Sequence, residues 1–369
     1  MIKFSCEKVF LQNAIAVTSR AVAQKSSIPA LEGLLIHADQ QLTISGYNMQ
    51  TGIRTNVFAN VVEGGEIVLN ARLFGDIIRR MPDDMITFTA DEKMMVHVSC
   101  GDADFDILGL SAADYPDLPE VEDEYAVSMQ QKVLRSMIEE VAFAVSTNES
   151  RPVHTGALFE IADMCLNMVA VDGFRLAFRR EKLEKLEGGA FSFVCPGSAL
   201  SEVKSICGDT EDLVTVTLGK RHILFEIGDT QLICRRLEGE FLDYKNAIPR
   251  KNPIQIVAET KALIESIDRV SVVISDKLKS PVRCLFDHDK VMLSAKTGNG
   301  EAKDVCRVSG DGDKLEIGFN NRYLLDALRN ARTEQVKMEI SGPLSPVKVL
   351  PAEGNDFLYL VLPVRFKND

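Results

Sequence analysis

The chain repeats one pattern of helices and strands three times, at a spacing of about 120 residues. Each copy opens with a short apolar strand and then a helical segment, which spans 7–20, 129–146 and 259–275 in turn. A second helical segment follows a later strand in each copy, at 70–81, 195–208 and 320–332. This period is longer than that of solenoid repeats, so it predicts repeated whole domains.

Apolar residues recur at helical spacing in the opening segments. In the second copy they form one stripe, made of Val133, Leu134, Met137, Ile138, Val141 and Val145. The third copy repeats the stripe with Leu263, Ile264, Ile267, Val270 and Ile274. Asn70 and either Asn320 or Asn321 stand where N-cap residues belong, and Pro196 suits a first helical turn.

The segments between the helices alternate apolar and polar residues and contain turn residues, which is typical of hairpins. Two helices and about eight contiguous strands in each copy predict α+β domains with antiparallel sheets. Proline and charge are concentrated at 119–126 and 247–255, as in linkers. We therefore expect three domains, at 1–122, 123–249 and 250–369.

One hairpin stands out from its counterparts in the other copies. The sequence VAVDGFRLAF at 169–178 places an Asp-Gly turn between alternating apolar runs, because both residues tolerate the positive φ of a tight turn. The corresponding segments, SGYNMQTGIRT and SAKTGNGEAKD, are polar or rich in glycine. The second copy instead offers Val171, Phe174 and Leu176 at its turn.

The charge is distributed unevenly along the chain. The net charge is −12, which argues against a simple basic nucleic-acid binder. The six helical segments nevertheless contain 13 Lys and Arg against 9 Asp and Glu, a balance of +4 that leaves −16 for the remainder. If all six lined one surface, that surface would attract phosphates, although ordinary ion pairing on solvated helix faces remains an alternative. No aromatic platform accompanies the basic residues, so non-specific contact with a duplex backbone fits best.

Other classes of protein find little support in the sequence. The first ten residues lack the apolar core of a signal peptide and the apolar runs are too short to cross a bilayer, so we expect a cytoplasmic protein without membrane contact. The eight cysteines form no C-x-x-C pair and read as buried thiols. The five histidines are scattered without zinc-site spacing, so we expect no metal, no cofactor and no catalytic residue.

Four further stretches complete the pattern: DGFRLA at 172–177, FLDYKNAIP at 241–249, IGFNNRYLLDAL at 317–328 and LVLPVRF at 360–366. With these and the threefold repeat, the chain resembles the bacterial sliding clamp, the β subunit of DNA polymerase III, over essentially its whole length. The resemblance implies three domains of the DNA clamp fold in each chain, with two helices per domain lining a ring and antiparallel sheets outside. Such a ring is a head-to-tail homodimer that encircles duplex DNA without sequence preference.

The resemblance also implies a function and a set of surfaces. The expected function is that of a non-catalytic processivity factor, which slides along DNA and tethers the replicative polymerase. Together with the charge distribution, it puts the following residues on the DNA side: Lys25, Arg72, Arg79, Arg80, Lys132, Arg135, Asn148, Arg151, Lys204 and Arg322. It puts Ile77, Met81, Phe105 and Ile107 on one side of the dimer interface, and Val273 and Ile274 on the other.

In the family, the hairpin of the second copy and the last strand form an apolar groove for short linear peptides. The expected partners are DNA polymerase III and other polymerases, the clamp loader and repair proteins. By position the groove includes His154, Val171, Gly173, Phe174, Arg175, Leu176, Leu242, Ile248, Leu344, Pro346, Leu360, Leu362, Val364 and Arg365. Family members often carry Thr-Asp-Gly-His where this chain has Val171 to Phe174, and proline where it has Leu242. We therefore expect a different peptide preference.

Two other hypotheses stay open on the sequence alone. A scaffold built from repeats could bind proteins without encircling DNA. An enzyme could assemble its catalytic residues in space from distant positions, which residue order cannot reveal.

Overall fold

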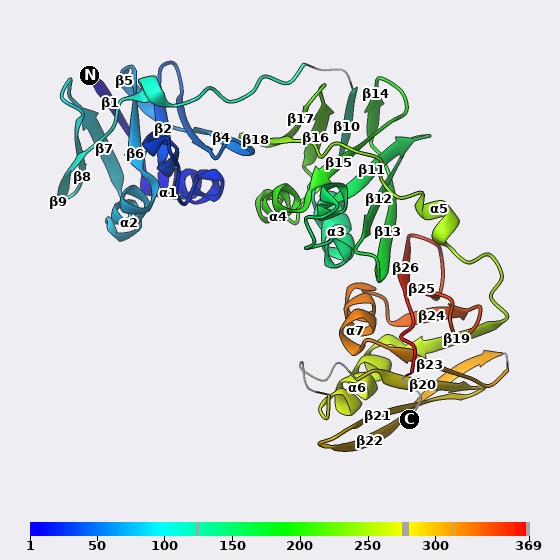
Figure 1. The fold of residues 1–369 in the computed structure, drawn as a ribbon. Helices are drawn as coiled ribbons and strands as arrows, with labels where there is room; N and C mark the ends of the chain where they lie inside the picture. Colours follow the sequence, from blue (N-terminus) through cyan, green and yellow to red (C-terminus); the bar gives the residue numbers. More distant parts are fainter. Residues whose placement is uncertain (123–124, 275–279, 312, 367–369) are drawn as a thin grey trace. The chain divides into compact units, whose positions relative to one another are not determined.

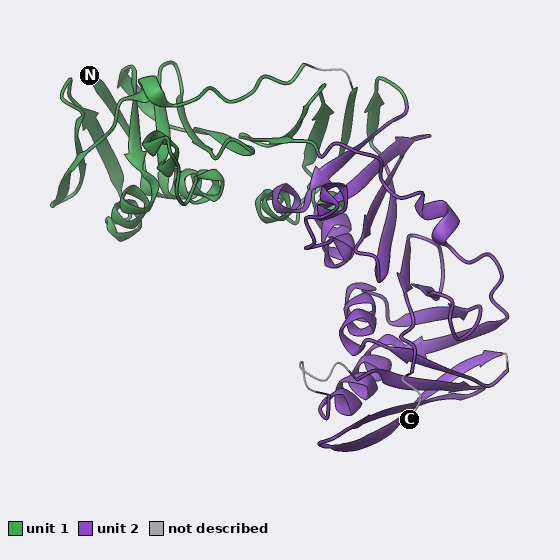
Figure 2. Ribbon diagram, in the orientation of Figure 1, with its two compact units in different colours: residues 1–134, 184–189, 201–236 green, residues 135–183, 190–200, 237–369 purple. Residues whose placement is uncertain are grey.

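A computed structural model describes residues 1–122, 125–274, 280–311 and 313–366. Residues 123–124, in the first expected linker, and 275, at the end of an expected helix, lie outside the described residues. The chain forms two compact units, shown in Figure 2. Unit 1 comprises 1–134, 184–189 and 201–236, and unit 2 comprises 135–183, 190–200 and 237–369.

Unit 1 contains two sheets whose pairings are all antiparallel (Figure 1). The first has the order β5-β1-β7-β8-β9, with strands β1 Ile2–Glu7, β5 Asn60–Glu63, β7 Met85–Ala90, β8 Met95–Cys100 and β9 Ala103–Leu108. The second has the order β14-β10-β16-β17-β18-β4-β3-β2-β6. Its strands are β2 Gly33–Ala38, β3 Leu42–Tyr47, β4 Thr51–Val57, β6 Gly65–Asn70, β10 Tyr125–Gln130, β14 Lys185–Glu187, β16 Leu213–Leu218, β17 His222–Ile227 and β18 Thr230–Arg235.

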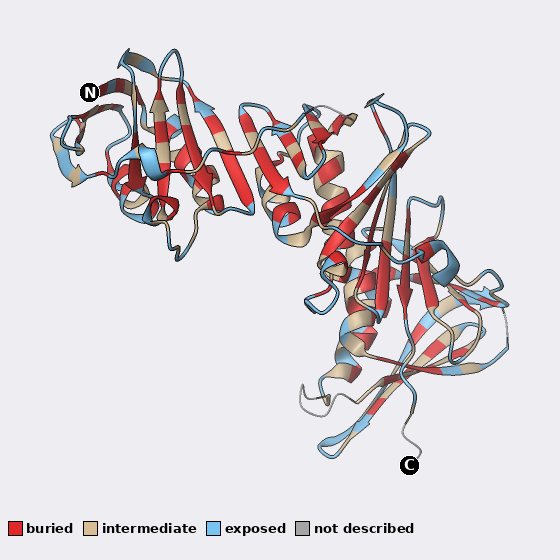
Figure 3. Cartoon of the chain, turned by 45° about the horizontal axis from the view of Figure 1, so that its top comes forward, coloured by how far each residue is buried: buried red, intermediate tan, exposed pale blue. Residues whose placement is uncertain are grey.

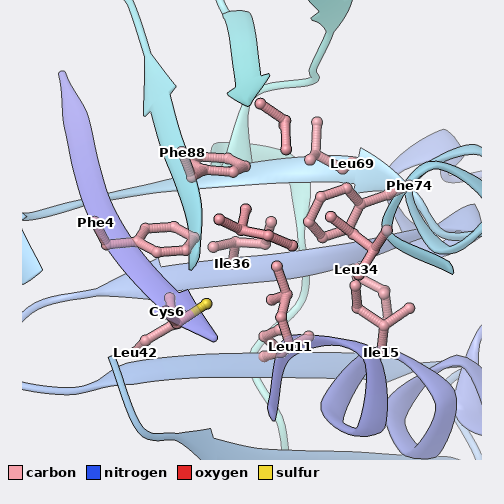
Figure 4. Close-up of a cluster of buried hydrophobic side chains, with 14 of the residues drawn as sticks. Phe4, Cys6, Leu11, Ile15, Leu34, Ile36, Leu42, Leu69, Phe74 and Phe88 are labelled. Atoms are coloured by element: carbon pink, nitrogen blue, oxygen red, sulfur yellow. The ribbon is translucent and has the colours of Figure 1, made fainter. Parts of the chain in front are cut away.

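Helices α1 (Lys8–Thr18) and α2 (Ala71–Arg80) lie side by side against the strands of unit 1 (Figure 1). Their apolar faces close a core with both sheets, in which Phe4 stacks on Phe88 at 4.5 Å and Phe74 meets Phe88 edge-on at 6.2 Å (Figure 4). Leu11 and Ile15 of α1 point into the same cluster. Burial of these large side chains explains why the short helices are stable.

Unit 2 contains one long sheet of the order β15-β11-β12-β13-β26-β25-β24-β19-β22-β21-β20-β23. Its strands are β11 Gly156–Ala162, β12 Cys165–Val171, β13 Arg175–Lys182, β15 Phe191–Pro196, β19 Ile254–Glu259, β20 Val282–Asp287, β21 Lys290–Thr297, β22 Gly300–Asp311, β23 Leu315–Phe319, β24 Gln335–Ile340, β25 Val347–Pro351 and β26 Phe357–Val361. Helices α6 (Thr260–Ser271) and α7 (Asn321–Asn330) pack on each other, and α5 (Tyr244–Ala247) is a single turn. Helices α3 (Gln131–Val141) and α4 (Gly197–Ile206) contribute residues to both units.

Successive copies of the repeat are joined by main-chain strand pairing. At the first joint, β18 of the second copy pairs with β4 of the first, from Thr230 opposite Thr55 to Cys234 opposite Thr51. At the second joint, β26 of the third copy pairs in the same way with β13 of the second. Each joint continues one sheet into the next copy. For that reason both units combine elements of two copies.

The structure confirms most of the local predictions. The six expected helices all form, although they end up to five residues before the predicted boundaries within the described residues. Asn70 caps α2 by accepting a hydrogen bond from the N–H of Leu73, and Asn320 caps α7 through the N–H groups of Arg322 and Tyr323. The prediction for Pro196 was one residue off, because it closes β15 and α4 begins at Gly197.

Buried residues follow the predicted alternation along the strands, as Figure 3 shows. All eight cysteines are free thiols, seven buried and Cys165 half-buried. Burial raises the pKa of the Cys6 thiol to about 12, so that thiol is unreactive at neutral pH. None of the helices in the described ranges is long and apolar enough to cross a bilayer.

Candidate ligand groove and cationic helix surface

Three apolar residues at the second joint form the floor of the predicted groove. Val171 ends β12 and pairs with Leu176 of β13, which in turn lies opposite Leu360 of β26. These three side chains, named here the groove floor, are almost fully buried and pack with Tyr244. Ile248 packs against the same cluster from the connection after α5. The sheet register thus aligns three predicted residues, and the connection after α5 adds the fourth, Ile248.

The Asp-Gly turn beside the floor is held by its own side chain. Asp172 Oδ1 accepts hydrogen bonds from the N–H groups of Phe174 and Arg175, at 2.9 and 3.0 Å. Gly173 has a φ of +90°, which a residue with a Cβ rarely adopts. The turn is thus preorganised before any ligand arrives.

Arg175 is buried at the base of this turn, away from the solvent. Its guanidinium forms ion pairs with Asp172 and with Asp326 of α7. It also lies 5.3 Å from the centre of the Phe143 ring and 4.7 Å from that of Tyr323. With both carboxylates and both rings already around it, Arg175 supports the hairpin and has little capacity left for a ligand.

Phe174 provides the exposed rim of the groove. Its side chain is 56% exposed, yet the ring stacks on Tyr323 with centroids 5.5 Å apart. Its carbonyl oxygen accepts a hydrogen bond of 2.9 Å from the N–H of Leu362, whose side chain is also exposed. An aromatic and an aliphatic side chain are therefore held next to each other in water, which is typical of a binding rim.

His154 and Leu242 lie together at a second hollow of unit 2, which is also lined by Phe241 and Arg151. The His154 ring meets Phe241 edge-on at 5.6 Å. Burial and the neighbouring charge of Arg151 lower the pKa of His154, so the ring is neutral at pH 7. The same hollow carries three acidic side chains, of Glu238, Glu240 and Asp243.

The remaining predicted groove residues lie on loops and at the end of the last strand. Pro346 and Leu362 flank the Val347–Val361 pair, so they are neighbours across β25 and β26. Leu344 is exposed in the loop before β25. Val364 donates its N–H to Gly318 on β23, and Arg365 is exposed. The sequence did not single out Tyr323 and Asp326, because their only signal is spatial proximity to the hairpin.

Several of the predicted cationic residues are paired with carboxylates of the chain. Arg79 and Arg80 pair with Asp76, Lys132 with Glu211, and Arg135 with Glu139. Arg322 is mostly exposed and lies 4.0 Å from Asp326. Exposed pairs of this kind contribute about 0–1 kcal/mol, so a phosphate can compete for the cation.

Other residues that were predicted on the DNA side are free to bind an anion. Lys25, Arg72, Arg151 and Lys204 make no ion pair or hydrogen bond through their side chains within the described parts of the chain. Arg72 borders a hollow between α1 and α2. Asn148 uses its side-chain oxygen to accept from the N–H of Ser150, which orders the loop before Arg151.

The predicted interface residues differ in exposure. Ile77 and Met81 are buried in the core of unit 1, Ile107 packs against it, and Phe105 is 40% exposed on β9. In unit 2, Val273 and Ile274 are half-buried after α6. The structure adds three exposed apolar side chains that the sequence pattern did not mark, namely Leu108, Val272 and Val305.

Among residues 1–122, 125–274, 280–311 and 313–366, no group of three or more His, Cys, Asp or Glu side chains could hold a metal ion. The described residues provide an apolar cluster with an exposed rim in unit 2, and cationic side chains on the helices and adjoining loops of each unit. The first suits an extended peptide and the second a polyanion.

Comparison with known proteins covers almost the entire chain. Three family models match in series: the N-terminal domain of the DNA polymerase III beta subunit at 2–119, its central domain at 128–243 and its C-terminal domain at 245–365. The beta sliding clamp of Halalkalibacterium halodurans is 31% identical, with 97% of each chain covered.

Solved structures agree with these matches. A putative DNA polymerase III beta subunit from Eubacterium rectale superposes with a TM-score of 0.95 at 28% identity, covering 99% of this chain and 100% of that one. The DNA polymerase sliding clamp from Bacillus subtilis superposes with a TM-score of 0.95 at 26% identity, with the same coverage.

Proposed function

Since the chain belongs to the family of DNA polymerase III beta subunits, the sliding clamps, we propose that two copies close into a ring that tethers a polymerase to duplex DNA. The chain is a non-catalytic processivity subunit. Its domains would end near 122, between the first two matched segments, and near 249, a few residues after the third matched segment begins. The observation that carries the proposal of closure is the antiparallel joint between copies.

The joint occurs twice within the chain. The two strands that would form a third joint, one in the first copy and one in the third, each keep an open edge. In both joints a final strand of one copy, β18 or β26, pairs with a middle strand of the preceding copy, β4 or β13. The final strand of the first copy is β9, which is the edge of its sheet. The corresponding middle strand of the third copy is the first part of β22, whose residues 300–307 pair, among the described residues, with β21 alone. By the same rule, β9 of one chain pairs with β22 of a second chain.

Apolar side chains beside these two edges support the same pairing. Leu108 and Phe105 project from β9, and Val305 lies on β22, with Val272 at the end of the neighbouring α6. Burying an exposed leucine or valine contributes about 1.5–3 kcal/mol. Pairing therefore covers both an open strand edge and the exposed apolar surface around it.

The cationic helix surface is the proposed contact with DNA. The free cations Lys25, Arg72, Arg151 and Lys204 supply sequence-independent attraction to phosphates. The paired cations contribute less, because their carboxylates must first be released. A closed ring holds DNA topologically, so weak contacts are sufficient and allow sliding.

The groove of the second joint is the proposed docking site for linear peptides of polymerases, the clamp loader and repair proteins. A ligand would bury apolar side chains over the groove floor and against Phe174 and Leu362. The acidic hollow around Leu242 favours basic residues at that end of the ligand.

Retention on circular DNA tests the proposal. The purified chain, loaded onto a nicked circular duplex by a clamp loader, should stay bound after gel filtration and be lost when the circle is linearised. Equal loss from intact and linearised circles would contradict encirclement and would favour a scaffold that does not enclose DNA. Sedimentation of the chain alone should give the mass of a dimer.

A further inference from the structure

The first joint has the same build as the second, strand for strand. Tyr47 ends β3 and pairs with Gly52 of β4, and Gly52 lies opposite Ile233 of β18. These positions match Val171, Leu176 and Leu360 of the groove floor in strand and in register. The first joint therefore contains the three positions of a second groove floor.

The linker that follows β9 lies on that floor. Leu110 forms a bridge with Val68 on the edge strand β6, just as Leu237 forms a bridge with Val194 on β15 at the second joint. Beyond the bridge, Tyr115 and Leu118 pack with Tyr47 and Ile233 in one buried cluster. Both linker side chains are only 7% exposed.

The two linkers take different paths over equivalent strands. The Tyr115 hydroxyl donates to the backbone oxygen of Ser45 on β3, at 3.3 Å. The corresponding Tyr244 hydroxyl donates to Glu160 on β11, at 2.7 Å, and β11 is one strand farther from its joint than the equivalent of β3. Tyr115 thus makes its hydroxyl contact one strand nearer the joint than Tyr244 does, although both tyrosines pack on the floor of their own joint.

Gly52 makes room for the linker. A Cβ at this position would lie 3.0 Å from Cγ and Cδ2 of Leu118. At the equivalent position the second joint has Leu176, which itself forms part of the floor. The side chain missing from Gly52 is replaced by Leu118, supplied from a different segment of the same chain.

We infer that the first joint is a second groove of the same design, occupied by residues 111–121 as an intramolecular ligand. The inference takes one assumption from the proposed function, namely that the second joint is a groove for a ligand. A tethered segment acts at an effective concentration of about millimolar. An external peptide present at micromolar concentration would have to bind about a thousandfold tighter than the linker to displace it. Each chain therefore offers one groove to partners although it contains two.

The test asks whether a separate peptide with the linker sequence binds to the first joint once the chain's own linker has been weakened. The probe is a blocked synthetic peptide with the sequence of residues 111–121, and every protein carries Leu362→Asp to disable the groove at the second joint. We expect no binding to the variant with an intact linker. The additional changes Tyr115→Ala and Leu118→Ala should allow binding at least tenfold above that background. A control peptide carrying Leu118→Asp should not bind.

Hydrogen exchange locates the bound peptide. Protection of residues 47–53 and 230–235 on binding supports the inference. Absence of binding to the folded variant, or equal binding with the linker intact, would overturn it. If the double change prevents folding, Leu118→Ala alone is titrated in the same way. Neither result depends on whether the second joint binds polymerase peptides, so failure of the inference is distinct from failure of the proposed function.

Discussion

The guanidinium of Arg175 lies 4.7 Å from the centre of the Tyr323 ring, on which Phe174 also stacks. Tyr323 of α7 thus contacts both the buried cation Arg175 and the exposed ring Phe174 of the hairpin. Asp326, one turn along the same helix, completes the arrangement by pairing with Arg175. The shape of the rim depends on a buried cation beneath it.

Replacing Arg175 should weaken ligand binding indirectly. Arg175→Met leaves the half-buried Asp172 and Asp326 without their partner, which costs about 1–3 kcal/mol of unfolding free energy. We expect the hairpin at 172–176 to exchange its amides faster and peptide affinity to fall at least tenfold. The control, Arg365→Met, removes an exposed cation and should change stability little. Unchanged exchange in Arg175→Met would contradict the supporting role.

A charge on the groove rim should abolish peptide binding. Leu362→Asp places a carboxylate beside Phe174, where a ligand would bury apolar surface, and should weaken binding at least a hundredfold. The measurement is calorimetric titration with a linear peptide from the replicative polymerase of the same organism. Leu213→Asp, at another exposed leucine, in unit 1, is the control and should bind normally.

Charges at the open edges should separate the dimer. Leu108 is 69% exposed on β9 and Val272 is 83% exposed after α6, so either can become Asp without disturbing a core. We expect sedimentation at half the mass of the parent protein. Phe58→Asp alters an exposed apolar residue away from both edges and should leave the mass unchanged. A dimer that survives both edge changes would contradict pairing of β9 with β22.

Removing free cations should reduce the salt dependence of DNA binding. Each phosphate contact contributes about 0.9 to the slope of log affinity against log salt. Arg72→Gln and Lys204→Gln together should therefore lower the slope by up to about 2 on a short duplex. Lys220→Gln, which removes a cation already paired with Glu122, is the control. Equal slopes for the parent and the double variant would exclude these residues from the contact.

The pair of Glu339 and Lys348 should make unit 2 sensitive to acid. Burial alone would raise the pKa of Glu339, but hydrogen bonds and charges of Lys348 and Lys337 outweigh it and lower that pKa. The folded pKa is then below the unfolded one, so this stabilisation is present above about pH 4.5 and is lost as pH falls further. Glu339→Gln leaves Lys348 buried and unpaired, and should cost about 3 kcal/mol at pH 7. Denaturant midpoints between pH 3.5 and 7 measure both effects, and Glu339→Gln combined with Lys348→Met should recover most of the loss.

Local chemistry was sufficient to predict much of the fold. The Asp-Gly turn at 172–173 and the caps Asn70 and Asn320 depend on contacts within four residues, which sequence displays directly. The antiparallel sheets follow from alternation that persists through all three copies. The end of α6 is less well predicted, because apolar residues continue past Ser271.

Contacts between distant segments could not be predicted in this way. Arg175 looks like a ligand contact when it is seen beside Phe174, and its partner Asp326 is 151 residues away. The charge count of the helices likewise ignores pairs such as Arg332 with Glu139, which neutralise cations across copies. Leu118 occupies the first joint because Gly52 has no side chain there. The two residues are far apart in the sequence, so no local pattern predicts their contact.

The open edges of β9 and β22 also affect the solubility of newly made chains. A newly made copy carries two backbone edges that can nucleate aggregation until they are covered. Exposed charges lie along both edges, as Asp104 and Asp106 on β9 and as Glu301 and Lys303 on β22. They oppose indiscriminate stacking of nascent chains. Cells that produce this protein faster than its chains dimerise should therefore accumulate insoluble protein. Neutralising these four side chains should increase the insoluble fraction.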